Sequence, residues 1–397
     1  MQIHKAAGLM LAMSLALAST AYAKDPNWVR TIGTSVRWVD PAKADTVENQ
    51  TVRFPVRLTL GGDTFRLSLS NEHGPVDMHV GAVTLSYMDG SKEVFVPVTF
   101  SGRKDFIIAP NAPVLSDEIK APLGNQQVIN ISVYFPEKTA LTTFHGDRNP
   151  TAVSGPGDFT MTETAQFPTA ASFKTRPVFS GLDVAVDGAK TIVAYGDSIT
   201  DSGDDVTKPV ARWSDVLAER LMGAHKLYGV ANESIGGNRI LHENTGTNAL
   251  ARFDRDVLSL PNVGYVVMLE GINDIGNSGS VVNGEQWPTI TADALIAGYK
   301  QIVARAHEHG IKVYASQILP FMGARYSSED KDKVRQAVNT WILTPGNVDG
   351  VVDFSGAVAD PANPLQLNPP LERGDHLHPN DDGERAMGKA IDLKLFK

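Results

Sequence analysis

Four short segments in the second half of the chain contain residue types that could act together in one reaction. In chain order, the segments are residues 196–199, 232–238, 271–274 and 375–378. They supply a serine hydroxyl, groups that can donate hydrogen bonds, and a histidine that follows an aspartate at close spacing. Acyl transfer from an ester needs this set, because the hydroxyl requires a base and the developing oxyanion requires fixed donors.

The serine of the first segment and the last histidine of the fourth are the candidate reacting pair. Ser198 is the expected nucleophile and His378 the expected base, because a serine hydroxyl is a weak nucleophile until its proton is removed. Asp375 can bond to the other ring nitrogen of this histidine and fix its tautomer. The expected oxyanion donors are the backbone N–H of Ser198, the backbone N–H of Gly237 and the side-chain amide of Asn273.

Single residues in these segments also have ordinary explanations. Ser198 could simply cap a helix, because serine is a common N-cap residue. Gly236 directly precedes Gly237, so a shift of one residue would exchange their roles. His376 competes with His378 as the base, but only His378 stands three residues after the aspartate. The agreement of all four segments therefore matters more than any one of them.

The first three segments should follow strands of a parallel sheet. Apolar runs at residues 191–195, 227–231 and 265–269 predict strands, and each run leads directly into one segment. The remaining expected elements are two strands and three helices, at residues 312–319, 351–354, 209–222, 291–309 and 382–393. Repeated strand–helix units predict an α/β domain with a flavodoxin-like, doubly wound parallel sheet, which binds ligands beyond the carboxyl ends of its strands.

The first half of the chain has a different pattern, typical of antiparallel β-structure. Residues 64–70, 94–99 and 128–135 alternate between apolar and polar with period two, and glycine-containing turns separate such runs. No long helical period interrupts them. We therefore expect a β-sandwich or jelly-roll domain over residues 24–185 and the α/β domain over residues 186–397.

The first 23 residues predict a signal peptide. Lys5 precedes an apolar run over residues 6–18, and Ala21-Tyr22-Ala23 predicts cleavage after Ala23. The run is shorter than the roughly 20 residues that a membrane-spanning helix needs. After cleavage we expect no integral membrane segment and a protein that is secreted or periplasmic.

Composition and missing motifs exclude several classes of function. The formal net charge is −9, so the chain has no basic footprint for nucleic acid. Cysteine is absent, which excludes disulfides and thiolate metal sites. The sequence contains no Gly-x-Ser-x-Gly elbow, no Gly-x-x-x-x-Gly-Lys phosphate loop and no His-Glu-x-x-His zinc motif. No cofactor and no metal are expected.

Taken together, the four segments resemble the blocks of the SGNH, or GDSL-type, hydrolase family. The resemblance covers residues 191–397 and implies the SGNH hydrolase fold for this half, with the roles assigned above to the five site residues. Gly237 is favoured over Gly236 because it stands five residues after Asn232, as in the family's second block. The wider context is similar to secreted carbohydrate-esterase-like members that also carry an N-terminal β domain.

This resemblance implies a serine-type carboxylic ester hydrolase that forms an acyl-enzyme and deacetylates a polysaccharide or oligosaccharide. The expected partner is then an ester substrate, an acetylated carbohydrate. A broad-specificity lipase or arylesterase is an alternative with the same chemistry. The other alternative is a carbohydrate-binding protein with an inactive hydrolase half, whose sugar-stacking candidates are Trp28, Trp38, Tyr87 and Phe106.

Overall fold

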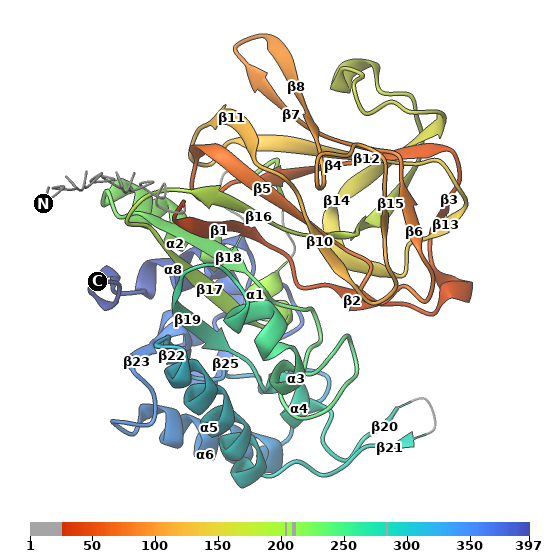
Figure 1. Cartoon of the computed structure of the whole chain (residues 1–397). Helices are drawn as coiled ribbons and strands as arrows, with labels where there is room; N and C mark the ends of the chain where they lie inside the picture. Colours follow the sequence, from red (N-terminus) through yellow and green to blue (C-terminus); the bar gives the residue numbers. More distant parts are fainter. Residues whose placement is uncertain (1–25, 203–204, 209–211, 283–284) are drawn as a thin grey trace, which may run out of the picture.

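The computed structural model describes residues 26–202, 205–208, 212–282 and 285–397 (Figure 1). The expected signal peptide lies outside the described residues and stays a prediction. Within the described ranges, no helix combines the length and the apolar character that crossing a membrane requires.

The first half of the chain consists of antiparallel sheets. One sheet has the order β1 (Trp28–Gly33), β16 (Phe179–Ala185), β5 (Gly62–Ser70) and β10 (Pro113–Leu115), with β11 (Ile119–Leu123) also on β5. The other has the order β15 (Thr169–Pro177), β14 (Thr143–Pro156), β4 (Gln50–Arg57), β12 (Val128–Phe135), β7 (Ala82–Asp89) and β8 (Lys92–Val98), with β2 (Arg37–Trp38) also on β14.

Short elements complete this half. They are the strand pairs β3 (Thr46–Val47) with β13 (Thr139–Ala140) and β6 (Met78–Val80) with β9 (Phe106–Ile108), and the 3-10 turns Pro41–Lys43 and Thr164–Gln166.

Alternation of apolar residues builds the core of the β half. Phe65, Leu67 and Leu69 of β5 are fully buried, and they share one apolar cluster with Ile129 and Ile131 of β12. The expected strands therefore lie in β5, β8 and β12, where the period-two pattern placed them. The β-sandwich or jelly-roll topology and the boundary between residues 185 and 186 stay predictions.

The second half contains a parallel sheet of five strands. Its order is β18 (Tyr228–Asn232), β17 (Lys190–Gly196), β19 (Val263–Leu269), β22 (Lys312–Ser316) and β23 (Gly350–Val352). All neighbouring strands in it are parallel. Numbered along this half, the order is 2-1-3-4-5, which is the flavodoxin-like arrangement that the sequence predicts.

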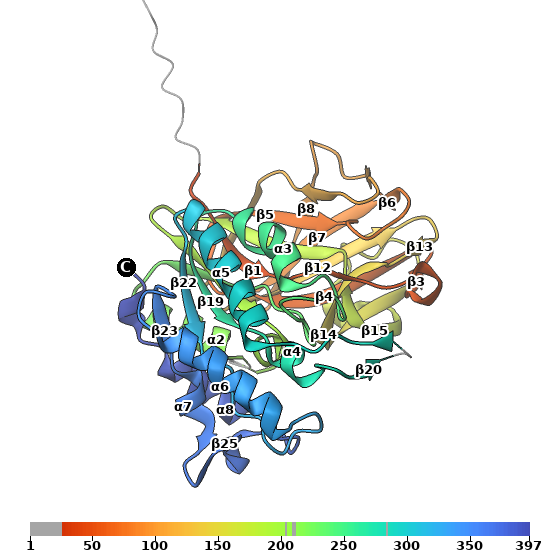
Figure 2. The same ribbon diagram turned by 90° about the horizontal axis from the view of Figure 1, so that it is seen from below.

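Helices cover both faces of this sheet (Figure 2). The helices are α1 (Ser198–Asp201), α2 (Trp213–Gly223), α3 (Ala249–Phe253), α4 (Ile272–Gly276), α5 (Ala292–Glu308), α6 (Glu329–Leu343), α7 (Phe354–Val358) and α8 (Asp381–Ala390). Helix α2 packs on α8, whereas α5 packs on both α3 and α6. The expected helix over residues 209–222 begins at Trp213, and residues 209–211 lie outside the described residues.

Smaller elements sit in the connections of this half. They are the hairpins β20 (Val281–Val282) with β21 (Glu285–Gln286) and β24 (Ala359–Asp360) with β25 (Asn363–Leu367), the π-helical turn Asp254–Leu258, and the 3-10 turns Pro369–Leu371 and Leu393–Leu395.

The two halves meet where β1 runs beside the edge strand β18 (Figure 1). A Cβ atom on Gly229 would lie 2.2 Å from the carbonyl oxygen of Arg30, so only glycine permits this approach. The backbone N–H of Arg30 donates to Thr191 Oγ1 at 2.9 Å, and that of Val230 donates to Thr59 Oγ1 at 3.0 Å. The contact is therefore close-packed and hydrogen-bonded.

Candidate active site

Ser198 is the first residue of α1, directly beyond the carboxyl end of the central strand β17. Asp197 caps this short helix, because its Oδ1 accepts the N–H of Ile199 at 2.9 Å. Gly196 permits the tight turn, since a Cβ atom there would lie 2.2 Å from the carbonyl oxygen of Leu269. The turn places the serine at the edge of the sheet where parallel α/β folds bind ligands.

The structure brings the predicted nucleophile, base and orienting carboxylate together. Ser198 Oγ lies 2.8 Å from His378 Nε2, and His378 Nδ1 lies 2.6 Å from Asp375 Oδ2. The other carboxylate oxygen of Asp375 accepts the backbone N–H groups of Leu377 and His378 at 3.0 and 2.9 Å. One loop therefore holds both the histidine and the aspartate in register for proton transfer.

These side chains remain open to solvent. The side chain of His378 is 25% exposed and that of Asp375 is 47% exposed. Although partial burial raises the pKa of Asp375, the hydrogen bonds from His378 and Leu377 outweigh it and lower this pKa. Asp375 is therefore a carboxylate at neutral pH and can hold the Nδ1 proton of the histidine.

The three predicted oxyanion donors come from the start of α1, from the second segment and from α4. The backbone N–H groups of Ser198 and Gly237 donate to no acceptor among the described residues. Asn273 Nδ2 uses one of its hydrogens on the carbonyl oxygen of Asn238 at 3.0 Å, which fixes the amide and leaves the second hydrogen for a ligand. The arrangement can stabilise an oxyanion.

The backbone N–H groups of the neighbouring Gly236 and Gly237 differ in whether they already have an acceptor. The N–H of Gly236 donates to Asp201 Oδ2 at 3.0 Å, so this group already has an acceptor. Gly237 has φ +80°, a left-handed conformation that suits glycine. Of the two N–H groups, the one of Gly237 is therefore available to a substrate. His376, the rival to His378, lies 3.6 Å from Glu372, and no contact joins it to Ser198.

A buried carboxylate holds the loop that follows Gly237. Asp274 is fully buried, and its two oxygens accept the backbone N–H groups of Ile240 and Leu241 at 2.7 and 3.0 Å. Asn273 stands beside it in α4, so the same helix supplies an oxyanion donor and fixes the second segment. Burial raises the pKa of Asp274, and the two N–H bonds oppose that rise.

A second buried carboxylate lies directly under the nucleophile. Burial raises the pKa of Asp197 to about 7, with the charges of Asp274 and Asp201 adding to the rise and the Ile199 N–H opposing it. Its Oδ2 has no hydrogen-bond partner among the described residues. The raised pKa agrees with this environment, because a buried oxygen without a hydrogen-bond donor disfavours the charged form of the carboxyl group.

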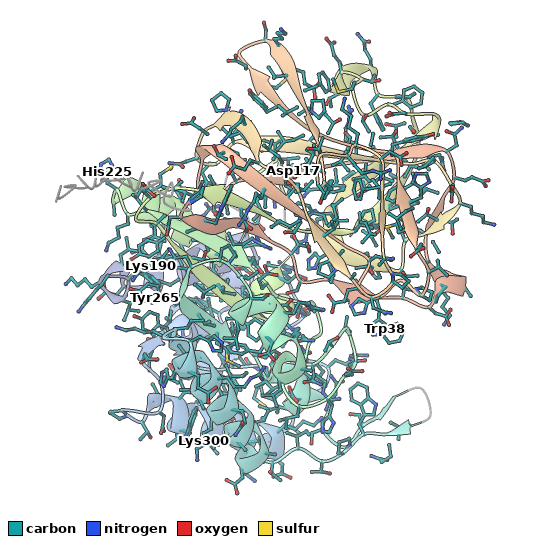
Figure 3. The ribbon with its side chains drawn as sticks, in the orientation of Figure 1. Trp38, Asp117, Lys190, His225, Tyr265 and Lys300 are labelled. Carbon is teal, nitrogen blue, oxygen red and sulfur yellow. The ribbon has the colours of Figure 1, made fainter. Side chains whose placement is uncertain are left out.

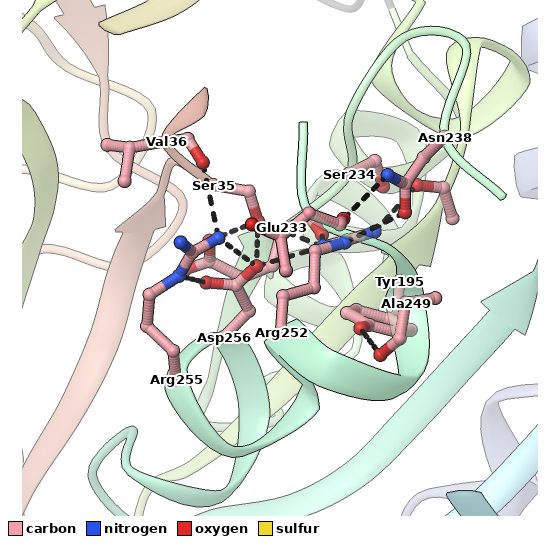
Figure 4. A network of polar contacts seen from close by, with 12 residues as sticks. Ser35, Val36, Tyr195, Glu233, Ser234, Asn238, Ala249, Arg252, Arg255 and Asp256 are labelled. Carbon is pink, nitrogen blue, oxygen red and sulfur yellow. Dashed lines mark hydrogen bonds and ion pairs between the residues drawn. The ribbon is translucent and has the colours of Figure 1, made fainter. Parts of the chain in front are cut away.

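Arg252 of α3 joins three parts of the site (Figure 4). Its guanidinium donates to the carbonyl oxygens of Glu233 at 2.6 Å and Gly196 at 3.1 Å, and to Asn238 Oδ1 at 2.9 Å. It also pairs with Asp256 Oδ2 at 3.0 Å. The first and second segments are therefore tied to one fully buried cation.

The β half reaches the site at two places. Ser35 Oγ lies 3.1 Å from Glu233 Oε2 and 2.8 Å from Asp256 Oδ2. His145 Nε2 lies 3.2 Å from Asp201 Oδ1, and its Nδ1 lies 2.8 Å from the carbonyl oxygen of Ser35. Sequence reasoning missed these residues because no local pattern links them to segments 56 to 221 positions away.

No group of three or more histidine, cysteine or acidic side chains among the described residues could hold a metal ion. His307, which forms a possible metal pair with His309 in the sequence, instead contacts Asp349 Oδ2 at 2.8 Å.

Residues 194–386 match the model of the GDSL-like lipase/acylhydrolase family. No curated protein matches the chain. Among solved structures, a GDSL-like lipase from Bacteroides thetaiotaomicron is 21% identical, with a TM-score of 0.38 over 52% of this chain and 87% of its own. An acetylxylan esterase from Geobacillus stearothermophilus is 19% identical, with a TM-score of 0.40 over 52% of this chain and 94% of its own.

The family match covers the first three segments and the triad loop in one continuous stretch. Residues 194–386 therefore belong to the GDSL-like lipase/acylhydrolase family, and this half of the chain is a GDSL/SGNH-type esterase domain.

Proposed function

We propose that this protein hydrolyses carboxylic esters through a covalent acyl-serine intermediate. The observation that carries the proposal is the continuous hydrogen-bonded chain from Ser198 Oγ through His378 to Asp375, with separations of 2.8 and 2.6 Å. This chain supplies a nucleophile, a base within reach of its proton, and a carboxylate that orients the base.

The reaction follows from these positions. Ser198 Oγ attacks the ester carbonyl carbon while His378 Nε2 takes the hydroxyl proton. The N–H groups of Ser198 and Gly237 and the Asn273 amide hold the oxyanion. When the bond to the alcohol breaks, His378 gives its proton to the leaving oxygen. Water then attacks the acyl-enzyme with the same base, which releases the acid and restores the serine.

The first test compares wild-type protein with Ser198→Ala on p-nitrophenyl acetate at pH 8. We expect turnover by the wild type and its loss in the variant, because removal of the nucleophile leaves only the donors in place. Equal turnover by both proteins would show that another residue attacks the ester. Absence of turnover by both would remove the support for a small-ester hydrolase.

For the substrate we propose an acetyl ester on a polysaccharide or oligosaccharide, and we propose that the protein is exported. The resemblance to carbohydrate-esterase-like sequences and the solvent exposure of His378 and Asp375 support this substrate, because an open site admits an ester on a large chain. The sequence of residues 1–23 supports export. Release of acetate from acetylated xylan, and mass spectrometry of the mature N-terminus, test the two parts.

The lipase alternative predicts a different response to acyl length. Each buried methylene group contributes about 0.8 kcal/mol, so a long-chain enzyme should gain about fourfold in kcat/KM per added methylene. A pocket at the end of α4 has a mixed lining, in which the polar Asn277, Ser280, Arg325 and Lys331 stand beside Val281 and Tyr326. A series of p-nitrophenyl esters from acetate to decanoate separates the two functions.

In the β half, Trp38 is the residue best placed to stack on a carbohydrate ring. The side chain of Trp38 is 53% exposed on β2 and lines a surface pocket. In contrast, Tyr87 and Phe106 are buried core residues, and Trp28 stacks on the Arg66 guanidinium at 3.9 Å. Loss of retention on insoluble xylan in Trp38→Ala would assign this binding to Trp38.

A further inference from the structure

A pocket of about 250 Å³ lies beside the nucleophile, and the β half supplies most of its wall. We call it the cationic pocket, and its lining includes Arg37, His145, Arg148, Lys174, Asp201 and Gly236. A Cβ atom on Gly236 would lie 3.9 Å from the Cβ of Ser198. The pocket therefore begins next to the reacting hydroxyl.

Arg37 is a cation without an acceptor in this pocket. Its guanidinium lies 5.0 Å over the ring of Phe144 and donates no hydrogen bond to any described residue. Its Nε is fully buried. Burial lowers the pKa of Arg37, against the attraction of Asp201, yet arginine stays charged in proteins. A partly desolvated charge of this kind is stabilised by an anion that supplies the missing acceptors.

The carboxylate of Asp201 does not fill that role. Its Oδ1 lies 3.2 Å from His145 Nε2, and its Oδ2 accepts the Gly236 N–H. Both oxygens thus have partners, and neither hydrogen-bonds to Arg37. Burial alone would raise the pKa of Asp201, but the neighbouring His145 lowers it, so this carboxylate is charged and committed to the pocket wall.

Two further cations stand at the mouth of the pocket. Lys174 of β15 and Arg148 of β14 are exposed, and neither donates a hydrogen bond to an acceptor among the described residues. The described lining residues therefore comprise three permanent or near-permanent cations and one carboxylate. The net charge of this lining is positive in a chain whose formal net charge is −9.

We propose that the cationic pocket binds an anionic group, a carboxylate or a phosphate, that the substrate carries next to its ester. This inference rests on the proposed ester hydrolysis and names the substrate class, an acidic carbohydrate ester such as an acetylated uronic acid. The planar guanidinium of Arg37 suits both oxyanions, because its N–H groups can pair with two oxygens at once.

The kinetic test uses one sugar in two charge states. The pair is an O-acetylated methyl galacturonoside and its C6 methyl ester, which share the acetyl group and the ring. We expect the wild type to prefer the free carboxylate by about tenfold or more in kcat/KM, since a charge-assisted hydrogen bond contributes about 1.5–3 kcal/mol. Equal kcat/KM values for the two esters would overturn the proposal. An acetylated sugar 6-phosphate, compared with its unphosphorylated form, tells which oxyanion the pocket takes.

Variants then connect this preference with the pocket. In Arg37→Gln and Lys174→Gln the ratio of kcat/KM between the two esters should fall towards one. Lys300→Gln is the matched control, because Lys300 is an exposed lysine of α5 at the far end of the α/β half (Figure 3). A ratio that stays unchanged in Arg37→Gln would contradict the assignment.

A binding measurement separates this inference from the proposed reaction. Calorimetric titration of Ser198→Ala with trigalacturonate does not depend on turnover. We expect saturable binding that weakens about tenfold or more when Arg37→Gln is added, and that declines with salt. Binding to Ser198→Ala, together with no ester turnover by the wild type, would support the anion site and contradict the proposed hydrolysis. Turnover of p-nitrophenyl acetate by the wild type, with no binding of trigalacturonate and no preference for the charged ester, would support the proposed hydrolysis and contradict the anion site.

Discussion

The three proposed oxyanion donors differ in how they are held, and this difference determines what single substitutions should do. Asn273 is fixed by one hydrogen bond to the Asn238 carbonyl oxygen and presents its other N–H to the substrate. The donors of Ser198 and Gly237 belong to the backbone, so no side-chain change removes them directly. A substitution can remove only the Asn273 amide. The N–H of Gly237 can be displaced by adding a side chain at that residue.

Asn273→Ala should lower kcat about 10²–10³-fold with a small effect on KM, because the amide stabilises charge that develops in the transition state. Steady-state kinetics on p-nitrophenyl acetate measures the split between the two constants. A rise in KM at constant kcat would place Asn273 outside the oxyanion hole. Far-ultraviolet circular dichroism checks that the variant is folded.

Gly237→Ala should reduce both activity and stability. The residue has φ +80°, and a Cβ atom there would lie 2.9 Å from Thr245 Oγ1, so the loop must move and carry its N–H away. Gly90→Ala is a matched control, because Gly90 has φ +59° with nothing within 4 Å. Each variant should lose about 1–2 kcal/mol of unfolding free energy from the left-handed backbone.

Only the variant at Gly237 should also lose kcat. If Gly90→Ala reduced kcat equally, general destabilisation would explain both results.

At the scale of elements, a buried carboxyl joins α8 to α2. Glu384 Oε2 accepts the N–H of Trp213 at 2.9 Å, and its Oε1 has no partner among the described residues. Burial raises the pKa of Glu384 to about 8, against hydrogen bonds from Ser202 and Trp213. The folded state therefore binds more protons than the unfolded state between its ordinary pKa of 4.5 and about 8.

It follows that this contact stabilises the fold fully at acidic pH and loses its contribution as the pH rises towards 8. The glutamine in Glu384→Gln cannot ionise. The Tm of the variant, relative to that of the wild type, should therefore be higher at pH 8.5 than at pH 5. Differential scanning fluorimetry across that range measures it, with the exposed Glu243→Gln as control. A pH-independent difference would mean that Glu384 is ionised in the folded protein.

The comparison of helices shows what the sequence could predict. Helix α5 lies within a residue of its expected bounds, because its buried face is apolar: Leu295, Tyr299, Ile302 and Ala306. Helix α6 was not predicted, because its buried face includes Asp332, Arg335 and Asn339. Asn339 hydrogen-bonds both the N–H and the carbonyl oxygen of Ile318. A polar face that bonds to the segment after β22 leaves no hydrophobic period in the sequence.

The same difference applies to the site. The sequence predicts Ser198, Gly237, Asn273, Asp375 and His378 because their blocks are local. The structure joins Ser198, His378 and Asp375 by hydrogen bonds, whereas the roles of Gly237 and Asn273 stay predictions. The sequence could not predict Arg252, Arg37 or His145, because each has a contact 56 or more positions away in the chain, with Gly196, Phe144 and Asp201 respectively. The contact between His145 and Asp201 forms only after the two halves have packed, whereas the other two contacts each form through the folding of one half.

For the whole molecule, shared buried charges make the two halves depend on each other. Arg30 and Ser35 come from the β half. Arg30 Nη1 lies 3.9 Å from Glu233 Oε1 across the boundary, and Ser35 contacts both Glu233 and Asp256 there. Burial and the charge of Asp256 raise the pKa of Glu233 to about 8, against the charge of Arg30. Separation of the halves would remove counter-charges from groups that are fully buried.

We therefore expect the protein to unfold in one cooperative transition, with a calorimetric enthalpy equal to the van't Hoff enthalpy. Differential scanning calorimetry at pH 7 measures both enthalpies. Ser35→Ala should lower the single Tm without splitting the peak, because Asp256 keeps its bonds to Arg252 and Arg255. Two resolved transitions in the wild type would show that the halves unfold independently.

The bond between Ser35 and Asp256 also sets an order in time, because 221 positions separate the two residues. At a synthesis rate of about 5–20 residues per second, the serine is added to the chain about 10 to 45 seconds before its partner. During that interval the β half lacks the residues that cover Ser35 in the finished protein. A chain interrupted before residue 256 can neither close this surface nor contain Asn273, Asp375 and His378, so the proposed site can assemble only after His378 has been added.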